Sequence, residues 1–301
     1  MLIIIGNGFD LNLGLKTSWS NFLHSDQFRS HAASNYTLFN YLQGSHDLNT
    51  WINVEEELAK YASKLDNYGA SVDSFKQEFA VLSESLKEYL SENQVGETFS
   101  SITKTKSMHL IDKVQQILSK NIKPISVIDF NYTNSFKNLL YPLPPNMINP
   151  FSIKNIHGTY KGSDIIFGCE NFGNAFPTRN MGFIIKSHAN NYNGAELKTK
   201  LREESEIVIF GHSLGSTDHP YFKDFFMNLK NRTSPVLIKM FFHINGQALN
   251  EEMNIMSDYS LAEIKNNSNV TFDWINTHET STDDFSLLTA REVPLVKTAR
   301  Y

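Results

Sequence analysis

Three polar side chains of this sequence, Asn7, Asn131 and His157, each follow a short apolar run. Such runs are typical of strands buried in a parallel sheet, and ligands bind where the carboxyl ends of those strands meet. We therefore expect the three side chains, together with Asp10 and Ser213, to line one cleft. Histidine is suited to general-base catalysis, and an asparagine amide can orient a water or a sugar hydroxyl.

The loop after the first run, Gly6-Asn7-Gly8, suits a phosphate. Glycines let the backbone turn sharply and approach a ligand, and the amide groups at the start of the following helix attract anions. Asp10 would repel a phosphate, so we expect it to cap a helix N-terminus or to bind a sugar hydroxyl. A tight strand-to-helix turn without a ligand explains the same residues.

The loop after the second run continues from Asn131 with Tyr132, Thr133 and Asn134. Polar groups at this end of a strand are candidates for nucleotide contacts. Asparagine and threonine are also common helix caps, so each of them alone has a structural explanation.

A further apolar run, residues 207–210, leads into Gly211-His212-Ser213-Leu214-Gly215, with Asp218 as the expected cap of the next helix. The five residues match the G-x-S-x-G nucleophile elbow of serine hydrolases. An esterase then needs an acid and a histidine downstream. Asp273 and His278 are only five residues apart and flank one expected strand, with Asp258 as the other possible acid, so this hypothesis ranks below a nucleotide site.

The composition is that of a soluble globular protein: 301 residues, 41% hydrophobic and 20% charged. A net charge of -5 gives no reason to expect general nucleic-acid binding. Cys169 is the only cysteine, which excludes an internal disulfide framework and a cysteine-based zinc site. The N-terminal apolar run is too short for a signal peptide, and no apolar run is long enough to cross a membrane, so we expect a cytoplasmic location.

Between the first two strands the periodicity is helical. We expect a single doubly wound α/β domain over residues 1–301, Rossmann-like and mostly parallel, with a helical insertion over residues 30–122. Thr17 or Ser18 is available to cap a helix start at residues 16–23. Trp51 precedes Glu55-Glu56-Glu57, which form either a solvated first turn or a source of one carboxylate for the cleft. Residues 164–168 predict a short hairpin-like return.

The motifs, in their order, resemble those of the AbiH family of bacteriophage abortive-infection proteins. The resemblance rests on Gly-Asn-Gly-Phe-Asp-Leu from Gly6, on Trp51 with its glutamates, on residues 129–134, on Ile156-His157-Gly158 and on residues 210–218. It covers residues 1 to about 230, and the tail after about residue 245 has no matching motif. The resemblance implies a role in antiphage defence.

The same order is similar to a reduced sirtuin pattern, as in NAD-consuming defence enzymes. Asn131 falls on the motif asparagine and His157 on the catalytic histidine, whereas Thr133 stands where an aspartate is expected. One cysteine leaves no four-cysteine zinc module, so a protein deacylase is not expected. The resemblance implies a sirtuin-like effector that binds NAD or a related nucleotide and hydrolyses the nicotinamide–ribose bond.

In this hypothesis His157 is the general base, with an ordinary pKa near the working pH, and Asn131 orients the water or the ribose. The residues expected to contact NAD are Gly6, Asn7, Gly8, Asp10, Thr133, Asn134, Gly211, His212, Ser213 and Asp218. No metal is expected, and a phage trigger or a partner protein stays open. The alternatives are a non-catalytic nucleotide sensor that signals through the helical insertion and, less favoured, the esterase.

Overall fold

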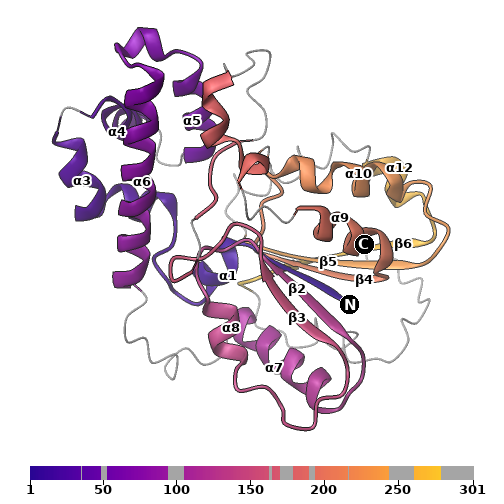
Figure 1. Ribbon diagram of the computed structural model, residues 1–301. Helices are drawn as coiled ribbons and strands as arrows, with labels where there is room; N and C mark the ends of the chain where they lie inside the picture. Colours follow the sequence, from indigo (N-terminus) through magenta and orange to yellow (C-terminus); the bar gives the residue numbers. More distant parts are fainter. Residues whose placement is uncertain are drawn as a thin grey trace.

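The computed structural model describes residues 1–34, 36–48, 53–93, 105–162, 165–169, 179–189, 194–215, 217–243 and 261–278. These residues form a six-stranded sheet of order β3-β2-β1-β4-β5-β6 (Figure 1), in which every neighbouring pair is parallel. The strands are β1 (Leu2–Ile5), β2 (Ile125–Asp129), β3 (Phe151–Asn155), β4 (Glu206–Phe210), β5 (Val236–Phe242) and β6 (Val270–Asn276).

The strand β1 lies at the centre of the sheet because all four of its side chains are apolar and buried. Ile3 and Ile5 belong to the core on one face of the sheet, and Leu2 and Ile4 to the core on the other. This alternation is the two-residue period of a strand, and an uninterrupted apolar run satisfies both faces.

Helices cover both faces of the sheet, which confirms the predicted doubly wound α/β class (Figure 1). One face carries α1 (Asn7–Asn12), α7 (Lys106–Ser119) and α8 (Ser135–Leu140); the other carries α9 (Gly194–Glu203), α10 (His219–Leu229) and α12 (Leu261–Lys265). Phe225 and Phe226 of α10 bury their rings in the second core, together with Leu197 and Leu201 of α9.

A separate helical block stands beside the carboxyl ends of the strands (Figure 1). It consists of α2 (Trp19–Leu23), α3 (Asp26–Ala32), α4 (Thr37–Leu48), α5 (Val54–Ala62), the 3-10 helix η1 (Leu65–Tyr68) and α6 (Val72–Asn93). These helices share their own hydrophobic core, whereas α7 packs with the sheet. The helices expected within residues 30–122 therefore fall into two groups. Ser18 is the N-cap of α2, accepting a hydrogen bond from the backbone of Asn21, as predicted.

Two segments differ from the sequence expectation. Residues 165–168 belong to no strand, but the amide of Ile166 donates to the carbonyl of His157 at 2.8 Å, and a parallel bridge joins Cys169 to Ile185. The strand β5 was not predicted, although it is an apolar run interrupted only by Lys239. Lys239 is accommodated because it pairs with Asp273 of β6 at 2.6 Å. Trp51, Asp164 and Asp258 lie outside the described residues.

No helix in the described part of the chain has the length and apolar character needed to span a membrane.

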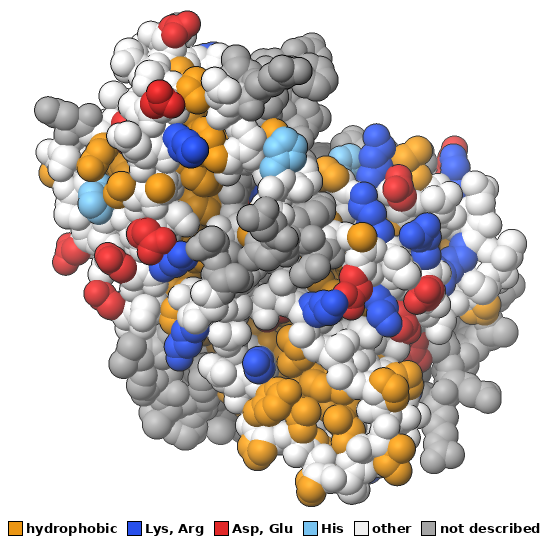
Figure 2. Space-filling model, in the orientation of Figure 1, with side chains coloured by type: hydrophobic (Ala, Val, Ile, Leu, Met, Phe, Trp, Pro, Cys, Tyr) orange, Lys and Arg blue, Asp and Glu red, His pale blue; other side chains and the backbone are white. Residues whose placement is uncertain are grey.

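Figure 2 shows hydrophobic side chains gathered over the region of α7, α8 and β3. In the loop between α8 and β3, Ile148 is 84% exposed.

Candidate functional site

The loops after β1 and β4 pack directly against each other. A Cβ atom on Gly6 would lie 2.5 Å from the His212 Cα, and one on Gly8 would lie 2.6 Å from the Gly211 Cα. The amide of Gly8 donates to the carbonyl of Gly211 at 2.8 Å, and Gly211 adopts a φ of 62°. The glycines are thus required by a backbone-to-backbone contact, and this contact alone accounts for their presence.

Asn7 holds the start of the helical block against the sheet. Its Oδ1 accepts a hydrogen bond from the hydroxyl of Thr17 at 2.6 Å, and its Nδ2 donates to the Thr17 carbonyl at 3.1 Å. Both ends of the side-chain amide are therefore used within the protein.

Asp10 connects α1 to the loop after β2. Thr133 donates to its Oδ2 at 2.6 Å, and Ser135 donates to its Oδ1. The Asp10 side chain is fully buried and lies inside α1, whose N-cap position is Gly6, so it does not cap that helix. Each Asp10 oxygen accepts a hydrogen bond from the protein, so a sugar hydroxyl would share the carboxylate with Thr133 and Ser135.

The end of β2 carries two buried polar groups whose hydrogen bonding is incomplete. Oδ1 of Asp129 accepts from the backbone amide of Asn131 at 2.9 Å, but within the described residues Oδ2 of Asp129 and Nδ2 of Asn131 have no partner. Burial, together with the charge of Asp10, raises the pKa of Asp129 well above its usual value. Buried groups left without partners are uncommon and often mark functional positions.

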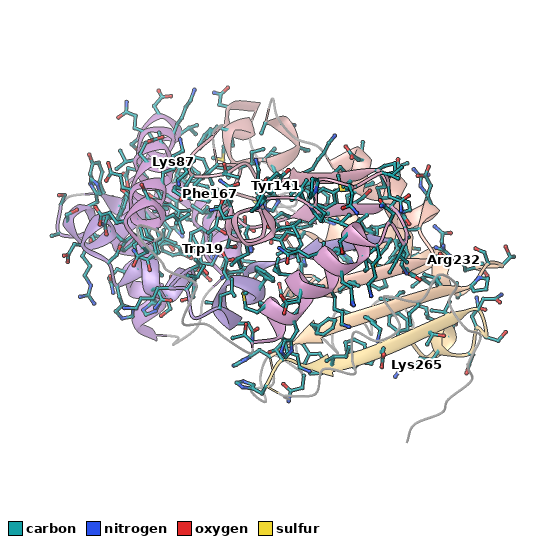
Figure 3. All side chains as sticks on the ribbon, turned by 90° about the horizontal axis from the view of Figure 1, so that it is seen from below. Trp19, Lys87, Tyr141, Phe167, Arg232 and Lys265 are labelled. Carbon is teal, nitrogen blue, oxygen red and sulfur yellow. The ribbon has the colours of Figure 1, made fainter. Side chains whose placement is uncertain are left out.

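A small pocket of about 70 Å³ opens beside Asn131, between the sheet and the helical block. Its lining is formed by residues of the loops after β1 and β2 and of helices α2 and α6: Asn7, Asp10, Thr17, Ser18, Trp19, Phe22, Leu86, Tyr89, Leu90, Phe130, Asn131, Tyr132 and Thr133. The ring of Trp19 lies 6.4 Å from that of Tyr132 and 6.0 Å from that of Phe167. Figure 3 shows Trp19 and Phe167 at the junction of the helical block and the sheet. The pocket is much smaller than the roughly 300–1,000 Å³ of ligand sites, so a nucleotide needs the two parts to separate.

His157 lies on the other side of the same loop. Its ring centroid is 5.2 Å from that of Phe130 and 6.1 Å from that of Tyr132, the residues that flank Asn131. The expected proximity of His157 and Asn131 is therefore present, although His157 does not line the pocket. Its Nε2 lies 3.5 Å from the Tyr221 hydroxyl and 3.6 Å from Oδ1 of Asp218.

The pKa of His157 is not near neutrality, contrary to expectation. Burial and the positive charge of Lys186 lower the pKa of His157 to about 3, and the opposing charge of Asp218 is too weak to compensate. The imidazole is therefore neutral at physiological pH and only weakly basic.

A buried charge cluster, Glu55, Lys186, Asp218 and His212, adjoins His157. Nζ of Lys186 lies 2.8 Å from Oε2 of Glu55 and 2.8 Å from Oδ1 of Asp218, and the lysine is 1% exposed. Lys186 belongs to the 3-10 helix η4 (Lys186–His188), close in sequence to η3 (Arg179–Ile184). Glu55 lies in the first turn of α5, and Asp218 directly precedes α10. The cluster therefore connects the helical block to the sheet.

The two carboxyl groups of the cluster differ in their ionisation. Burial would raise the pKa of Asp218, but Lys186 and a hydrogen bond from His212 hold it well below its usual value. For Glu55, burial and the charge of Asp218 outweigh the attraction of Lys186 and raise the pKa. Burial alone would lower the pKa of Lys186, whereas Asp218 and Glu55 raise it. Lys186 and Asp218 therefore form the ion pair, and Glu55 is the group that is harder to ionise.

The geometry around His212 defines its tautomer. Its Nδ1 accepts the backbone N–H of Leu214 at 3.0 Å, so the proton resides on Nε2, which lies 3.3 Å from Oδ2 of Asp218. Leu214 adopts a φ of 55°, which bends the loop for this contact. Asp218 was expected to cap α10; it occupies that position but makes no cap hydrogen bond, because its side chain turns to Lys186 and His212.

Ser213 is exposed, and no histidine of the described residues forms a hydrogen bond with it. The downstream candidates for a triad are used elsewhere, since Asp273 pairs with Lys239 and His278 contacts His243. The match to a nucleophile elbow is therefore not accompanied by triad geometry among the described residues.

Asn134 stands at the N-cap position of α8 without a cap hydrogen bond.

Two members of the cluster were missed or left open by the sequence. Lys186 lies in a segment with no periodicity, so nothing in its sequence context distinguishes it from a solvated lysine. Of the three glutamates, Glu55 is the one that enters the interior, while Glu57 bonds Tyr41 and Lys60. A helical wheel offers a signal here, because Glu55 is three residues before the buried Leu58.

Fold and site together define a doubly wound α/β protein, with a helical block over the carboxyl ends of its strands and buried polar groups at the junction. The family model of bacteriophage abortive infection AbiH matches residues 2–240. The chain therefore belongs to the AbiH family, which places it in antiphage defence. No protein with curated annotation matches it.

Proposed function

We propose that this protein acts in abortive infection by binding NAD or a related nucleotide at the pocket beside Asn131 and hydrolysing the nicotinamide–ribose bond. The observation that carries the proposal is the buried Nδ2 of Asn131, which has no partner among the described residues and belongs to the lining of the pocket. A buried amide donor without a partner is costly, and a ligand hydroxyl would satisfy it. The order of motifs adds support.

The aromatic lining suits the rings of a nucleotide. Trp19, Tyr89 and Tyr132 surround the pocket, and flat aromatic surfaces stack on bases. The nucleotide would enter when α2 and α6 move away from the loops after β1 and β2 while the pairs of Lys186 with Glu55 and Asp218 persist, since the closed pocket holds about 70 Å³. Closing over the substrate would also exclude bulk water from the reacting bond.

The weak basicity of His157 is compatible with this reaction. Cleavage of a glycosidic bond passes through an oxocarbenium-like state, which is a strong electrophile. Water attacks such a centre without a strong base, so a neutral imidazole with a pKa of about 3 suffices as a hydrogen-bond acceptor for the water. His157 does not line the closed pocket, so this role requires that the opening which admits the nucleotide also exposes the His157 ring to it. Asn131 would hold the ribose hydroxyls, and Tyr132 would lie between the two residues.

The test is incubation of the purified protein with NAD, followed by chromatography of free nicotinamide, in parallel with NAD measurement in phage-infected cells. We expect nicotinamide release or NAD loss with the natural chain and neither with Asn131→Ala. The matched control is Asn138→Ala, an exposed asparagine of α8. Undiminished protection of cells by Asn131→Ala would contradict the proposal.

A second candidate, a nucleotide sensor without catalysis, is favoured by the position of the pocket. Residues of α2 and α6 form one wall and the sheet loops the other, so a ligand there would change the contact between the two parts. Tight NAD binding without nicotinamide release, combined with loss of defence in Asn131→Ala, would select the sensor. Isothermal titration calorimetry on the same preparations measures that binding.

A further inference from the structure

Two histidines converge at the carboxyl ends of β5 and β6, away from the pocket. His243 follows the last residue of β5, and His278 follows β6 by two residues. Their Nε2 atoms are 3.2 Å apart and their ring centroids 4.1 Å apart. Both side chains are exposed, and neither belongs to the site described above.

The backbone holds the two rings in register. Phe242 pairs with Asn276 in the parallel ladder, and the amide of Thr277 donates to the carbonyl of Phe242 at 2.9 Å. Oδ1 of Asn276 accepts the amide of His278 at 3.0 Å, which shapes the turn that brings the ring back over β5. The pair is thus placed by the sheet rather than by two free loops.

The separation of the nitrogens matches two ligands of one metal ion. With Zn–N bonds of about 2.0–2.1 Å at the tetrahedral angle, two imidazole nitrogens lie about 3.3–3.4 Å apart. A cis pair in a square-planar Cu²⁺ site would be closer, at about 2.8 Å. The observed 3.2 Å is also at the long end of ordinary N–H hydrogen bonds.

We propose that His243 and His278 bind a divalent transition-metal ion, Zn²⁺ in the first instance, at the carboxyl ends of β5 and β6. In the part of the chain that the structure describes, no group of three or more possible metal ligands is found, so these two histidines are the protein ligands that the described residues supply, and water or another oxygen ligand would take further positions. This assignment departs from the sequence expectation that the protein binds no metal.

The test is a Zn²⁺ titration by calorimetry of the full chain without a histidine tag, on the natural protein and on His243→Gln and His278→Gln. We expect one ion per chain, with each substitution weakening binding at least tenfold, because loss of an outer-shell partner alone costs roughly 10–100-fold. Both histidines are exposed, so the variants should remain folded, which circular dichroism checks. With Co²⁺, the natural chain should also show the visible absorption of a tetrahedral site.

A matched control is available in the helical block. The rings of His24 and His46 are also close, with centroids 4.7 Å apart, but His24 Nδ1 contacts the Ser20 carbonyl and His46 Nε2 contacts the Ser20 hydroxyl. One nitrogen of each ring thus already contacts Ser20, so His24→Gln should leave Zn²⁺ affinity unchanged. The proposal is overturned if the natural chain shows no saturable binding, or if His243→Gln and His278→Gln bind Zn²⁺ as tightly as it does.

Discussion

The two sides of the loop after β2 treat buried polar groups in opposite ways. On one side, the cluster of Glu55, Lys186, Asp218 and His212 pairs its lysine with two carboxyl groups at 2.8 Å each. On the other side, Asn131 keeps an amide without a described partner beside the pocket. Breaking a buried pair of charges is costly, and a buried amide without a partner is costly as well unless another group satisfies it. The cluster therefore suits attachment of the helical block, and the pocket is the place where the proposed ligand would satisfy Asn131.

The largest test of this comparison is Lys186→Met. The substitution leaves Glu55 and Asp218 buried without their cation, and breaking a buried pair in this way costs about 3–5 kcal/mol of unfolding free energy. Urea denaturation followed by circular dichroism measures the loss. Glu55→Gln should cost only about 1 kcal/mol, because Lys186 keeps Asp218 as its partner and the glutamine keeps the shape.

The control for the lysine is Lys60→Met. Lys60 also pairs with a glutamate, Glu57, but its side chain is 60% exposed, so its removal should cost less than about 1 kcal/mol. Equal losses for Lys186→Met and Lys60→Met would show that the cluster does not fasten the helical block to the sheet.

The next test addresses the pocket. Asn131→Ala should lower nicotinamide release by about 10²-fold or more, as loss of a positioning contact does, with little change in stability. Stability should hold because Nδ2 of Asn131 has no described partner to lose. By contrast, Asn7→Ala removes both hydrogen bonds with Thr17 and should cost about 1–2 kcal/mol. A large loss of stability in Asn131→Ala would mean that its amide has a structural partner.

The pH dependence of stability tests the environment of His157. Its pKa is about 3 in the folded chain and about 6.5 when unfolded, so between these values the unfolded state binds a proton that the folded state does not. The contribution of His157 to stability therefore falls as the pH falls, by about 2 kcal/mol from pH 6.5 to pH 5. Urea titrations at the two pH values measure it.

His157→Gln removes this titrating group and should reduce the loss between pH 6.5 and pH 5 by that amount. Asn131→Ala keeps the His157 imidazole, so its loss of stability between pH 6.5 and pH 5 should equal that of the natural chain. An unaltered pH response in His157→Gln would indicate that the imidazole is accessible to protons in the folded state.

The smallest effect is expected at Ser213. Ser213→Ala should change stability by less than about 0.5 kcal/mol, because the side chain is exposed, and should leave defence intact. A fluorophosphonate probe should not label Ser213, since no described histidine activates it. Covalent labelling of Ser213 would favour the esterase hypothesis over nucleotide binding at the pocket beside Asn131.

Much of the sheet could be predicted because a strand that is buried on both faces appears in the sequence as a short, nearly continuous apolar run. β1 and β4 are largely apolar runs that end at a glycine, and β2 is a mostly apolar run followed by Phe130 and the polar Asn131. β5 is also an apolar run, but it contains Lys239. The burial of this lysine could not be predicted because its partner, Asp273, belongs to another strand. Residues 165–169 form only isolated backbone hydrogen bonds, with His157 and Ile184, because a short apolar run does not reveal how much of it pairs with a neighbour.

The sequence by itself determined the class of fold, the capped start of α2 and the convergence of the loops that carry Asn7, Asn131 and His157. These follow from local pattern and from the rule that parallel strands end at one edge of the sheet. It also carried the family motifs, whose order does not depend on knowing any contact.

Only the tertiary structure decided which polar residues are satisfied and which are not. In the folded chain the two glycine loops pack against each other, and Asp10 accepts hydrogen bonds from Thr133 and Ser135. Of the three glutamates, Glu55 is the one that pairs with Lys186. The tertiary structure also moved the pKa of His157 far from neutrality. The physical reason is that burial and the field of distant charges depend on residues brought together from separate parts of the chain, and neither leaves a trace in local sequence.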